Sequence, residues 1–114
     1  MTGNLDLLTE ITEEVNKEFL KKLRIGSVDY TIKEKSCVLL NNEAKYGTCD
    51  FSEQVIEIEK RASNQRKIQT LLHELLHAIS YEYSLDLSEH QVELLSIGLL
   101  QVFRDNPSLK RKIF

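Results

Sequence analysis

The chain is poor in the residues that mark linkers and cross-links, and it has no long apolar run. One proline and four glycines in 114 residues are too few for a long flexible linker. The two cysteines, Cys37 and Cys49, lack the spacing of a redox or metal-binding pair, so we expect free thiols in a reducing compartment. The longest uncharged stretch, residues 94–103, is far shorter than the roughly 20 apolar residues that cross a bilayer. The sequence therefore predicts no membrane-spanning helix.

Charge of one sign is not in excess either. Fifteen basic and eighteen acidic residues give a net charge of −3, which does not favour binding to nucleic-acid phosphates. Apolar residues make up 41% and charged residues 29% of the chain, values that exclude wholesale disorder. Residues 1–6 lack the basic start and apolar core of a signal peptide. We expect one domain over residues 1–114, soluble and cytoplasmic, with no nucleic-acid or membrane partner.

The N-terminal half contains two different apolar periods. Over residues 5–24 apolar side chains recur at spacings of three and four, which predicts an amphipathic helix that ends at Gly26. In residues 28–32 apolar and polar side chains alternate, which predicts a half-buried strand. Residues 35–45 have no clear pattern and form a loop or a short element.

Two further strands are predicted in the middle of the chain, at residues 46–51 and 54–59. A tight turn at residues 52–53 joins them. In the second strand Ile56 and Ile58 would face the core.

Two helices complete the predicted fold. The first runs from Asn64, its N-cap, to Tyr83. Ser88 opens the second, and Gln91 completes a capping-box pattern. This helix should end at Asp105, because Pro107 disfavours helical geometry at Asn106. The fold class is α+β, with an N-terminal helix, a small three-stranded, mostly antiparallel sheet and two C-terminal helices.

The first of these helices contains His73-Glu74-Leu75-Leu76-His77, an H-E-x-x-H pattern. Residues four apart project from one helix face, so both imidazoles can reach a single ion. Glu74 can meet a metal-bound water without becoming a ligand. The apolar residues of this helix fall on nearly the opposite side from the histidines, which places the pair on a cleft; they are Ile68, Leu71, Leu72, Leu75 and Ile79. The alternative is a chance match between two surface histidines.

A catalytic zinc needs a third protein ligand. The downstream candidates are Glu82, Asp86, Glu89, His90 and Glu93. Glu93 is favoured because it opens the apolar run 93–100, whose helix we expect to be largely buried, and a buried carboxylate is costly unless it is paired or binds metal. At 1.5 Å per residue its depth along an antiparallel helix pair also matches that of His77.

Several alternatives stay open for this helix. Glu93 could form a salt bridge with Arg104 or Arg24. His90 could be the third ligand, although it lies close to the helix start. Glu89 could accept a hydrogen bond from a ligating histidine, or serve only as a first-turn acid that suits the helix dipole.

The H-E-x-x-H pattern, followed by a glutamate on the next helix, resembles the gluzincin metallopeptidases. The small size and the core H-E-L-L-H-A-I are most similar to minimal prophage anti-repressor (ImmA/IrrE-like) metallopeptidases. The run 93–100 is similar to the E-x-x-A-x-x-[FL]-A helix that supplies the third ligand there, and residues 46–50 with the strand ending at Glu59 resemble the preceding sheet segment. The resemblance covers residues 26–105. We expect no counterpart of their second subdomain or DNA-binding region in residues 1–114, and no metzincin pattern follows His77.

This resemblance implies a zincin-like fold, in which the helix 64–83 is the active-site helix and the C-terminal helix from Ser88 bears the third ligand. It also implies a zinc-dependent metalloendopeptidase that acts on a peptide or protein substrate. His73, His77 and Glu93 would bind Zn²⁺, and Glu74 would be the general base. Tyr81 is a possible transition-state donor, with Tyr83 and Tyr46 as further candidates that could equally be packing residues. An extended peptide could add to the sheet edge at the hairpin 46–59.

The main alternative is a zincin-fold binding protein of prophage type, catalytically weak or inactive, that sequesters a repressor or other protein partner. A structural zinc site would use four protein ligands, and neither Cys37 nor Cys49 has a spacing that nominates it as the fourth. The basic tail, residues 107–114, is expected to be a frayed terminus or, alternatively, to fold back and block the cleft.

Overall fold

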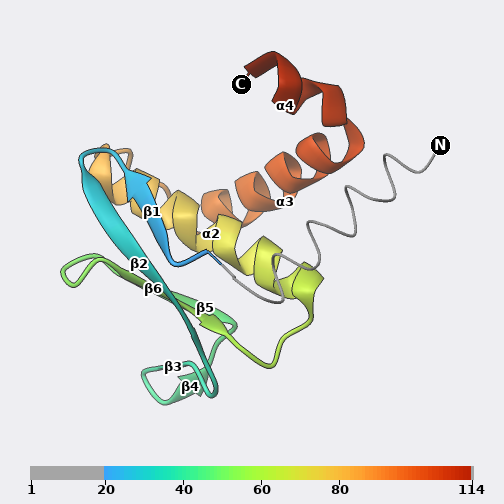
Figure 1. Cartoon of the computed structure of the whole chain (residues 1–114). Coiled ribbons are helices and arrows are strands. Elements are labelled where there is room, and N and C mark those ends of the chain that lie inside the picture. Colours follow the sequence, from blue (N-terminus) through green and yellow to red (C-terminus); the bar gives the residue numbers. More distant parts are fainter. Residues whose placement is uncertain (1–19, 114) are drawn as a thin grey trace.

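The computed structural model describes residues 20–113, and a four-stranded mixed sheet forms its base (Figure 1). Its strands are β1 (Lys22–Ile25), β2 (Val28–Lys35), β5 (Gly47–Asp50) and β6 (Val55–Glu59). They lie in the order β1-β2-β6-β5. β1 is antiparallel to β2, β2 is parallel to β6, and β6 is antiparallel to β5. The strands predicted at 28–32, 46–51 and 54–59 are confirmed, and β5 forms an edge of the sheet.

The predicted helix over residues 5–24 is wrong at its C-terminal end, where β1 forms instead. Lys22, Leu23, Arg24 and Ile25 alternate between more and less exposed positions, as strand residues do. A two-residue turn joins β1 to β2, and its first residue, Gly26, has a φ of 62°, which hairpin turns require and glycine adopts without strain. The sheet therefore has four strands in place of the three expected. It is mostly antiparallel, as expected, with the β2–β6 pair parallel. Residues 5–19 of the predicted helix lie outside the described part of the chain.

A small hairpin occupies the segment that the sequence pattern left unassigned. β3 (Leu39–Leu40) pairs antiparallel with β4 (Glu43–Ala44). The turn between them is Asn41-Asn42, with φ values of 52° and 65°. Asparagine tolerates this left-handed conformation at both central positions of a type I′ turn, so the local sequence explains the hairpin.

Three helices complete the described α+β fold: α2 (Asn64–Glu82), α3 (Glu89–Asp105) and α4 (Pro107–Ile113). Ser63, one residue before the predicted cap, accepts a hydrogen bond from the Arg66 amide at the start of α2. The predicted capping box of Ser88 and Gln91 is present at the start of α3. The segment expected to be a frayed tail forms α4, whose first position suits a proline.

The core lies between the sheet and α2. Tyr30, Ile56 and Ile58 are fully buried, as is Ala78 on α2. The Tyr30 hydroxyl donates a hydrogen bond of 2.6 Å to Glu82 Oε2, which ties the end of α2 to the sheet. Part of the predicted apolar stripe of α2 packs against this cluster, namely Leu71, Leu75 and Ile79.

The expectation that the helix after Ser88 is largely buried was wrong. Within α3 only Val92 and Ser96 are buried. α3 packs on α2, and α2 lies between α3 and the sheet (Figure 1). The contact with α2 therefore covers only one stripe of the α3 surface. Its exposed large apolar residues are Leu94, Leu95, Ile97, Val102 and Phe103.

Candidate metal centre

Two histidines one turn apart on α2 form the centre of the site. His73 and His77 have ring centroids 4.9 Å apart, in an edge-to-face arrangement. Their side chains keep 14% and 21% of their surface exposed, so both rings are shielded yet reachable. The predicted projection of both histidines from one face is therefore confirmed.

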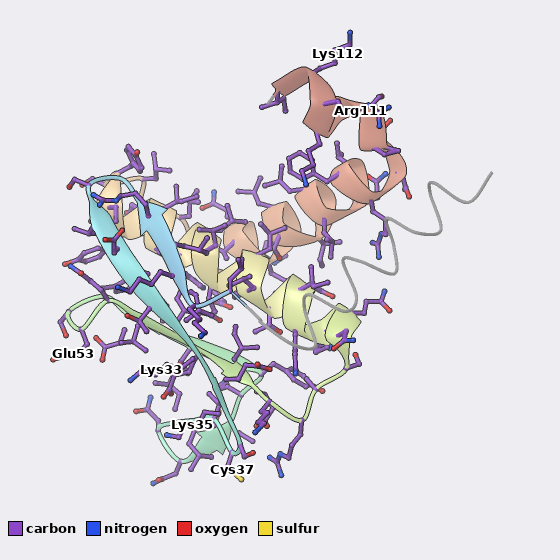
Figure 2. The ribbon with its side chains drawn as sticks, in the orientation of Figure 1. Lys33, Lys35, Cys37, Glu53, Arg111 and Lys112 are labelled. Carbon is purple, nitrogen blue, oxygen red and sulfur yellow. The ribbon has the colours of Figure 1, made fainter. Side chains whose placement is uncertain are left out.

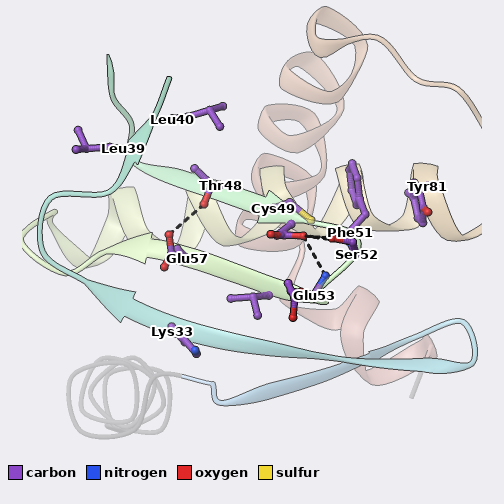
Figure 3. Close-up of a pocket in the computed structure, with 12 residues that line it drawn as sticks. Lys33, Leu39, Leu40, Thr48, Cys49, Phe51, Ser52, Glu53, Glu57 and Tyr81 are labelled. Atoms are coloured by element: carbon purple, nitrogen blue, oxygen red, sulfur yellow. Dashed lines mark hydrogen bonds between the residues drawn. The ribbon is translucent and has the colours of Figure 1, made fainter. Parts of the chain in front are cut away.

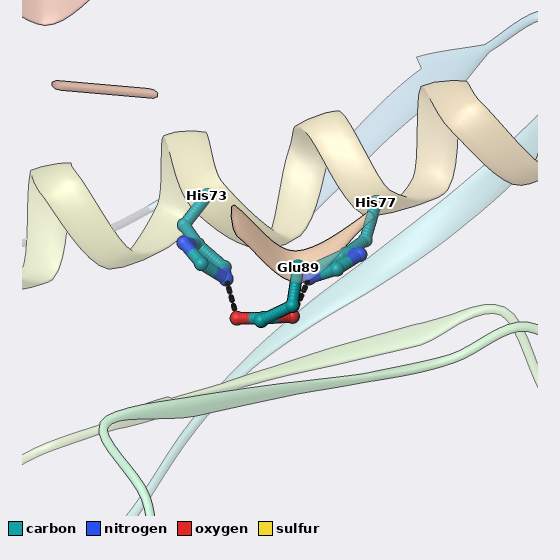
Figure 4. Close-up of side chains that lie close together, drawn as sticks. All are labelled: His73, His77 and Glu89. Atoms are coloured by element: carbon teal, nitrogen blue, oxygen red, sulfur yellow. Dashed lines mark hydrogen bonds and ion pairs between the residues drawn. The ribbon is translucent and has the colours of Figure 1, made fainter. Parts of the chain in front are cut away.

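The first residue of α3 joins both rings. Glu89 Oε1 lies 2.8 Å from His73 Nε2, and Glu89 Oε2 lies 2.7 Å from His77 Nε2. Figure 4 shows the carboxylate spanning the two imidazoles. One donor atom from each residue of this trio lies within 4.8 Å of the other two. This arrangement can hold a metal ion.

The turn between α2 and α3 brings Glu89 to this place. The Leu85 amide donates to the Ser80 carbonyl at 2.9 Å, and the Leu87 amide donates to Ser80 Oγ at 2.8 Å. Ser84 and Asp86 both have positive φ values, which bend the chain back sharply. Ser80 is buried in α2, so the start of α3 is held against α2.

Glu93 lies one turn further along α3 and meets the other nitrogen of His73. Its Oε2 is 2.7 Å from His73 Nδ1. Arg24, one proposed salt-bridge partner, instead pairs with Asp29 at 2.9 Å. The sequence pattern predicted Glu93 as the third metal ligand, with Glu89 as a hydrogen-bond acceptor or a first-turn acid. In the structure the Nε2 atoms of His73 and His77 both face Glu89. Helical rise alone favoured Glu93, because it does not account for the length of the Glu89 side chain, which extends across the α2–α3 turn to both histidines.

Glu74 lies beside the histidines in a buried position, with 8% of its surface exposed. Burial raises the pKa of Glu74 to about 7; the nearby Glu89 charge also raises the pKa, and His73 opposes the shift. A carboxyl group in such surroundings can take up and release a proton near neutral pH.

Gly47 allows β5 to lie close over Glu74. A Cβ on Gly47 would stand 3.3 Å from Glu74 Cγ and 3.0 Å from the Glu57 carbonyl oxygen, and it would overlap the Thr70 methyl group. Sequence reasoning did not single out this glycine, although a glycine within a strand often marks close approach of another group.

A cleft of about 230 Å³ joins these groups. Residues 45–47 at the start of β5, α2 and the first turns of α3 line it. The lining residues are Lys45, Tyr46, Gly47, Arg66, Gln69, Thr70, His73, Glu74, Glu89 and Glu93.

The other predicted site residues lie in different places. The Tyr81 ring stacks on Phe51 with centroids 4.5 Å apart, is 57% exposed, and lines a separate open hollow of about 810 Å³ (Figure 3). Tyr46 lines the cleft, whereas Tyr83 caps the end of α2 and is exposed. His90 is exposed and is not part of the trio.

The cysteines are free thiols, as predicted. Cys37 is exposed beyond the end of β2, near β3 and β4 (Figure 2). Cys49 is partly buried against the core. Neither is part of the trio of candidate ligands among the described residues.

Comparisons with protein-family models, curated proteins and solved structures found no match. Over residues 20–113, no helix combines the length and apolar character needed to cross a bilayer.

Proposed function

We propose that the chain is a zinc-dependent metalloendopeptidase of minimal, gluzincin type with a zincin-like fold, similar in design to the prophage anti-repressor (ImmA/IrrE-like) metallopeptidases, and that it acts in the cytoplasm. The observation that carries the proposal is the convergence of one donor atom each from His73, His77 and Glu89 within 4.8 Å of one another, with the Nε2 atoms of both histidines against the Glu89 carboxylate. Two imidazoles and one carboxylate are the protein ligand set of a catalytic zinc that keeps a position open.

The second partner of His73 supports this ligand set. An imidazole that binds metal through Nε2 carries its hydrogen on Nδ1, where a carboxylate commonly accepts it. Glu93 Oε2, 2.7 Å from Nδ1, is placed to accept that hydrogen. We therefore assign Glu89 to the metal and Glu93 to the orientation of His73, in place of the predicted Glu93 ligand.

A zinc ion held by these residues would supply Lewis acidity, polarising the peptide carbonyl and acidifying water. Glu74, buried in the cleft beside His73, would accept the proton of the attacking water and deliver it to the leaving amine. The exposed edge of β5 offers unpaired backbone groups to which an extended peptide can add as a further strand. Tyr81 stacks on Phe51 and does not line this cleft, and Tyr46 lines it but lies against Arg66, so we assign no tyrosine to the oxyanion.

Metal content and peptide cleavage test the proposal together. The purified protein, dialysed without chelator, should hold about one zinc per chain by mass spectrometry of the metal. It should cleave an unstructured protein such as casein, and Glu74→Gln should hold zinc without cleaving. Less than a tenth of an equivalent of zinc in the wild-type protein would end the metal proposal.

A second candidate function is the binding protein of prophage type, which would sequester a repressor or another protein. The exposed apolar side chains of α3, such as Leu94, Ile97 and Phe103, favour it because a protein partner would bury such a surface. Zinc binding with no cleavage by the wild-type protein would favour this candidate over the enzyme.

A further inference from the structure

Arg66 lies on the same face of α2 as the two histidines. It precedes His73 by seven residues, which is two helical turns, and the rise between them is roughly 10 Å. Arg66 lines the cleft together with Lys45 and Tyr46. Its guanidinium carbon is 4.8 Å from the centroid of the Tyr46 ring. Along α2 the cleft therefore has a cation at one end and the histidine–glutamate cluster at the other.

The basic groups around the start of α2 differ in their partners. Arg61 pairs with Glu59 at 3.0 Å, and Lys67 pairs with Glu34 at 2.6 Å. No carboxylate between residues 20 and 113 lies within ion-pair distance of Arg66.

The Tyr46 ring orients Arg66 without consuming its hydrogen-bond donors. A guanidinium stacked on an aromatic face keeps its N–H groups along its edge, where they match the two oxygens of a carboxylate. Lys45 lines the same end of the cleft and has an exposed contact of 3.5 Å with Glu43. Arg66 is therefore available to an anionic ligand in the cleft. Lys45 can exchange its exposed pair with Glu43 for the same ligand, because an exposed pair contributes little stability.

We propose that Arg66, assisted by Lys45, is a specificity-determining site that binds a carboxylate of the peptide substrate. The carboxylate belongs to an acidic side chain or to the peptide C-terminus. An extended peptide advances about 3.3 Å per residue, so a rise of roughly 10 Å places the carboxylate about three residues from the scissile bond. This inference rests on the proposed peptidase function, because it takes the histidine cluster as the point of cleavage.

Peptide binding to the zinc-loaded Glu74→Gln protein tests the inference without turnover. The probes are fluorescent octapeptides of neutral sequence with one glutamate moved through every position, matched glutamine peptides, and both sets with free or amidated C-termini. Fluorescence anisotropy should show one register in which the acidic peptide binds about tenfold more tightly than its neutral partner, as a charged hydrogen bond provides. A preference that tracks the glutamate indicates a side-chain carboxylate, and one that disappears on amidation indicates the terminus.

Variants in the same background attribute the preference to Arg66. Arg66→Gln should remove the preference for acidic peptides. Arg66→Lys should keep part of this preference, because a point charge lacks the planar fork. Arg104→Gln on α3 should leave the preference unchanged. An acidic-to-neutral ratio that is the same in Arg66→Gln overturns the inference, as does a failure of every peptide to bind.

Cleavage of the same peptides separates this inference from the proposed function. If the protein with Glu74 intact cleaves acidic and neutral peptides equally, the function stands and the carboxylate site does not. If acidic peptides bind in an Arg66-dependent way but none is cleaved, the carboxylate site stands and the peptidase function does not.

Discussion

Glu89 Oε1 stands 2.8 Å from His73 Nε2, while the other oxygen of the same carboxylate meets His77. A single side chain at the first position of α3 thus contacts both imidazoles of α2. Glu93, one turn later, reaches only the Nδ1 side of His73. Substitutions of the two glutamates are therefore expected to change zinc affinity to different extents.

Glu89→Ala should lose most of the zinc, because it removes a direct ligand. Glu93→Gln should weaken zinc binding by about 10- to 100-fold, the usual effect of losing a partner that orients a ligating histidine. Competition with a chromogenic chelator measures both affinities. His90→Ala, on the same helix and exposed, is the control and should bind zinc as the wild type does. The opposite order, with Glu93→Gln the more damaging change, would return the ligand role to Glu93.

Removal of the metal should abolish cleavage, and one equivalent of zinc should restore it. Glu74→Gln should lower kcat by about 10²- to 10⁴-fold, the range for loss of a general acid–base group. Zinc content should stay near one equivalent, since Glu74 is absent from the trio that can hold the ion. A Glu74→Gln protein that cleaves at the wild-type rate would contradict the assigned role.

The local parts of this fold could be predicted from the sequence. The Ser88–Gln91 capping box needs only residues within one turn, and the alternation at Ile56 and Ile58 places both in the core. β1 was missed because Leu23 continues the three- and four-residue spacing of the preceding segment. The strand forms through pairing with β2, a tertiary contact that overrides local preference.

The sequence predicted which residue types form the candidate site, but it did not predict all of their contacts. The shared face of His73 and His77 follows from helical periodicity, and Glu74 was identified by the H-E-x-x-H pattern. The choice between Glu89 and Glu93 depends on the turn that Ser80 fixes, which no periodicity encodes. Arg66 shares a helix face with the histidines, but its contact with Tyr46 depends on where β5 lies.

Gly47→Ala should destabilise the protein by about 1–3 kcal/mol, the usual cost of overpacking. The added methyl group would overlap the Thr70 side chain and crowd the Glu57 carbonyl, so β5 must move away from α2. Urea denaturation gives the free energy of unfolding. Thr70→Ala in the same chain should recover part of the loss. Gly98→Ala on α3, where an added Cβ meets nothing within 4 Å, is the matched control and should stabilise the helix by up to about 1 kcal/mol. Equal effects at the two glycines would mean that β5 does not lie against α2 in this way.

Acid should destabilise the fold through Glu59. Hydrogen bonds from the Arg61 side chain and backbone, together with the Val38 amide, lower the pKa of Glu59 from 4.5 to about 2. A carboxylate whose pKa is lower in the folded state contributes stability above its unfolded pKa and loses it as pH falls toward the folded value. The melting temperature should therefore drop between about pH 4.5 and pH 2. Glu59→Gln should melt lower than the wild type at pH 7 and show a shallower decline over this range. Glu53→Gln, at an exposed turn position, should keep the wild-type profile, and parallel declines in the wild type and Glu59→Gln would show that other groups set the acid sensitivity.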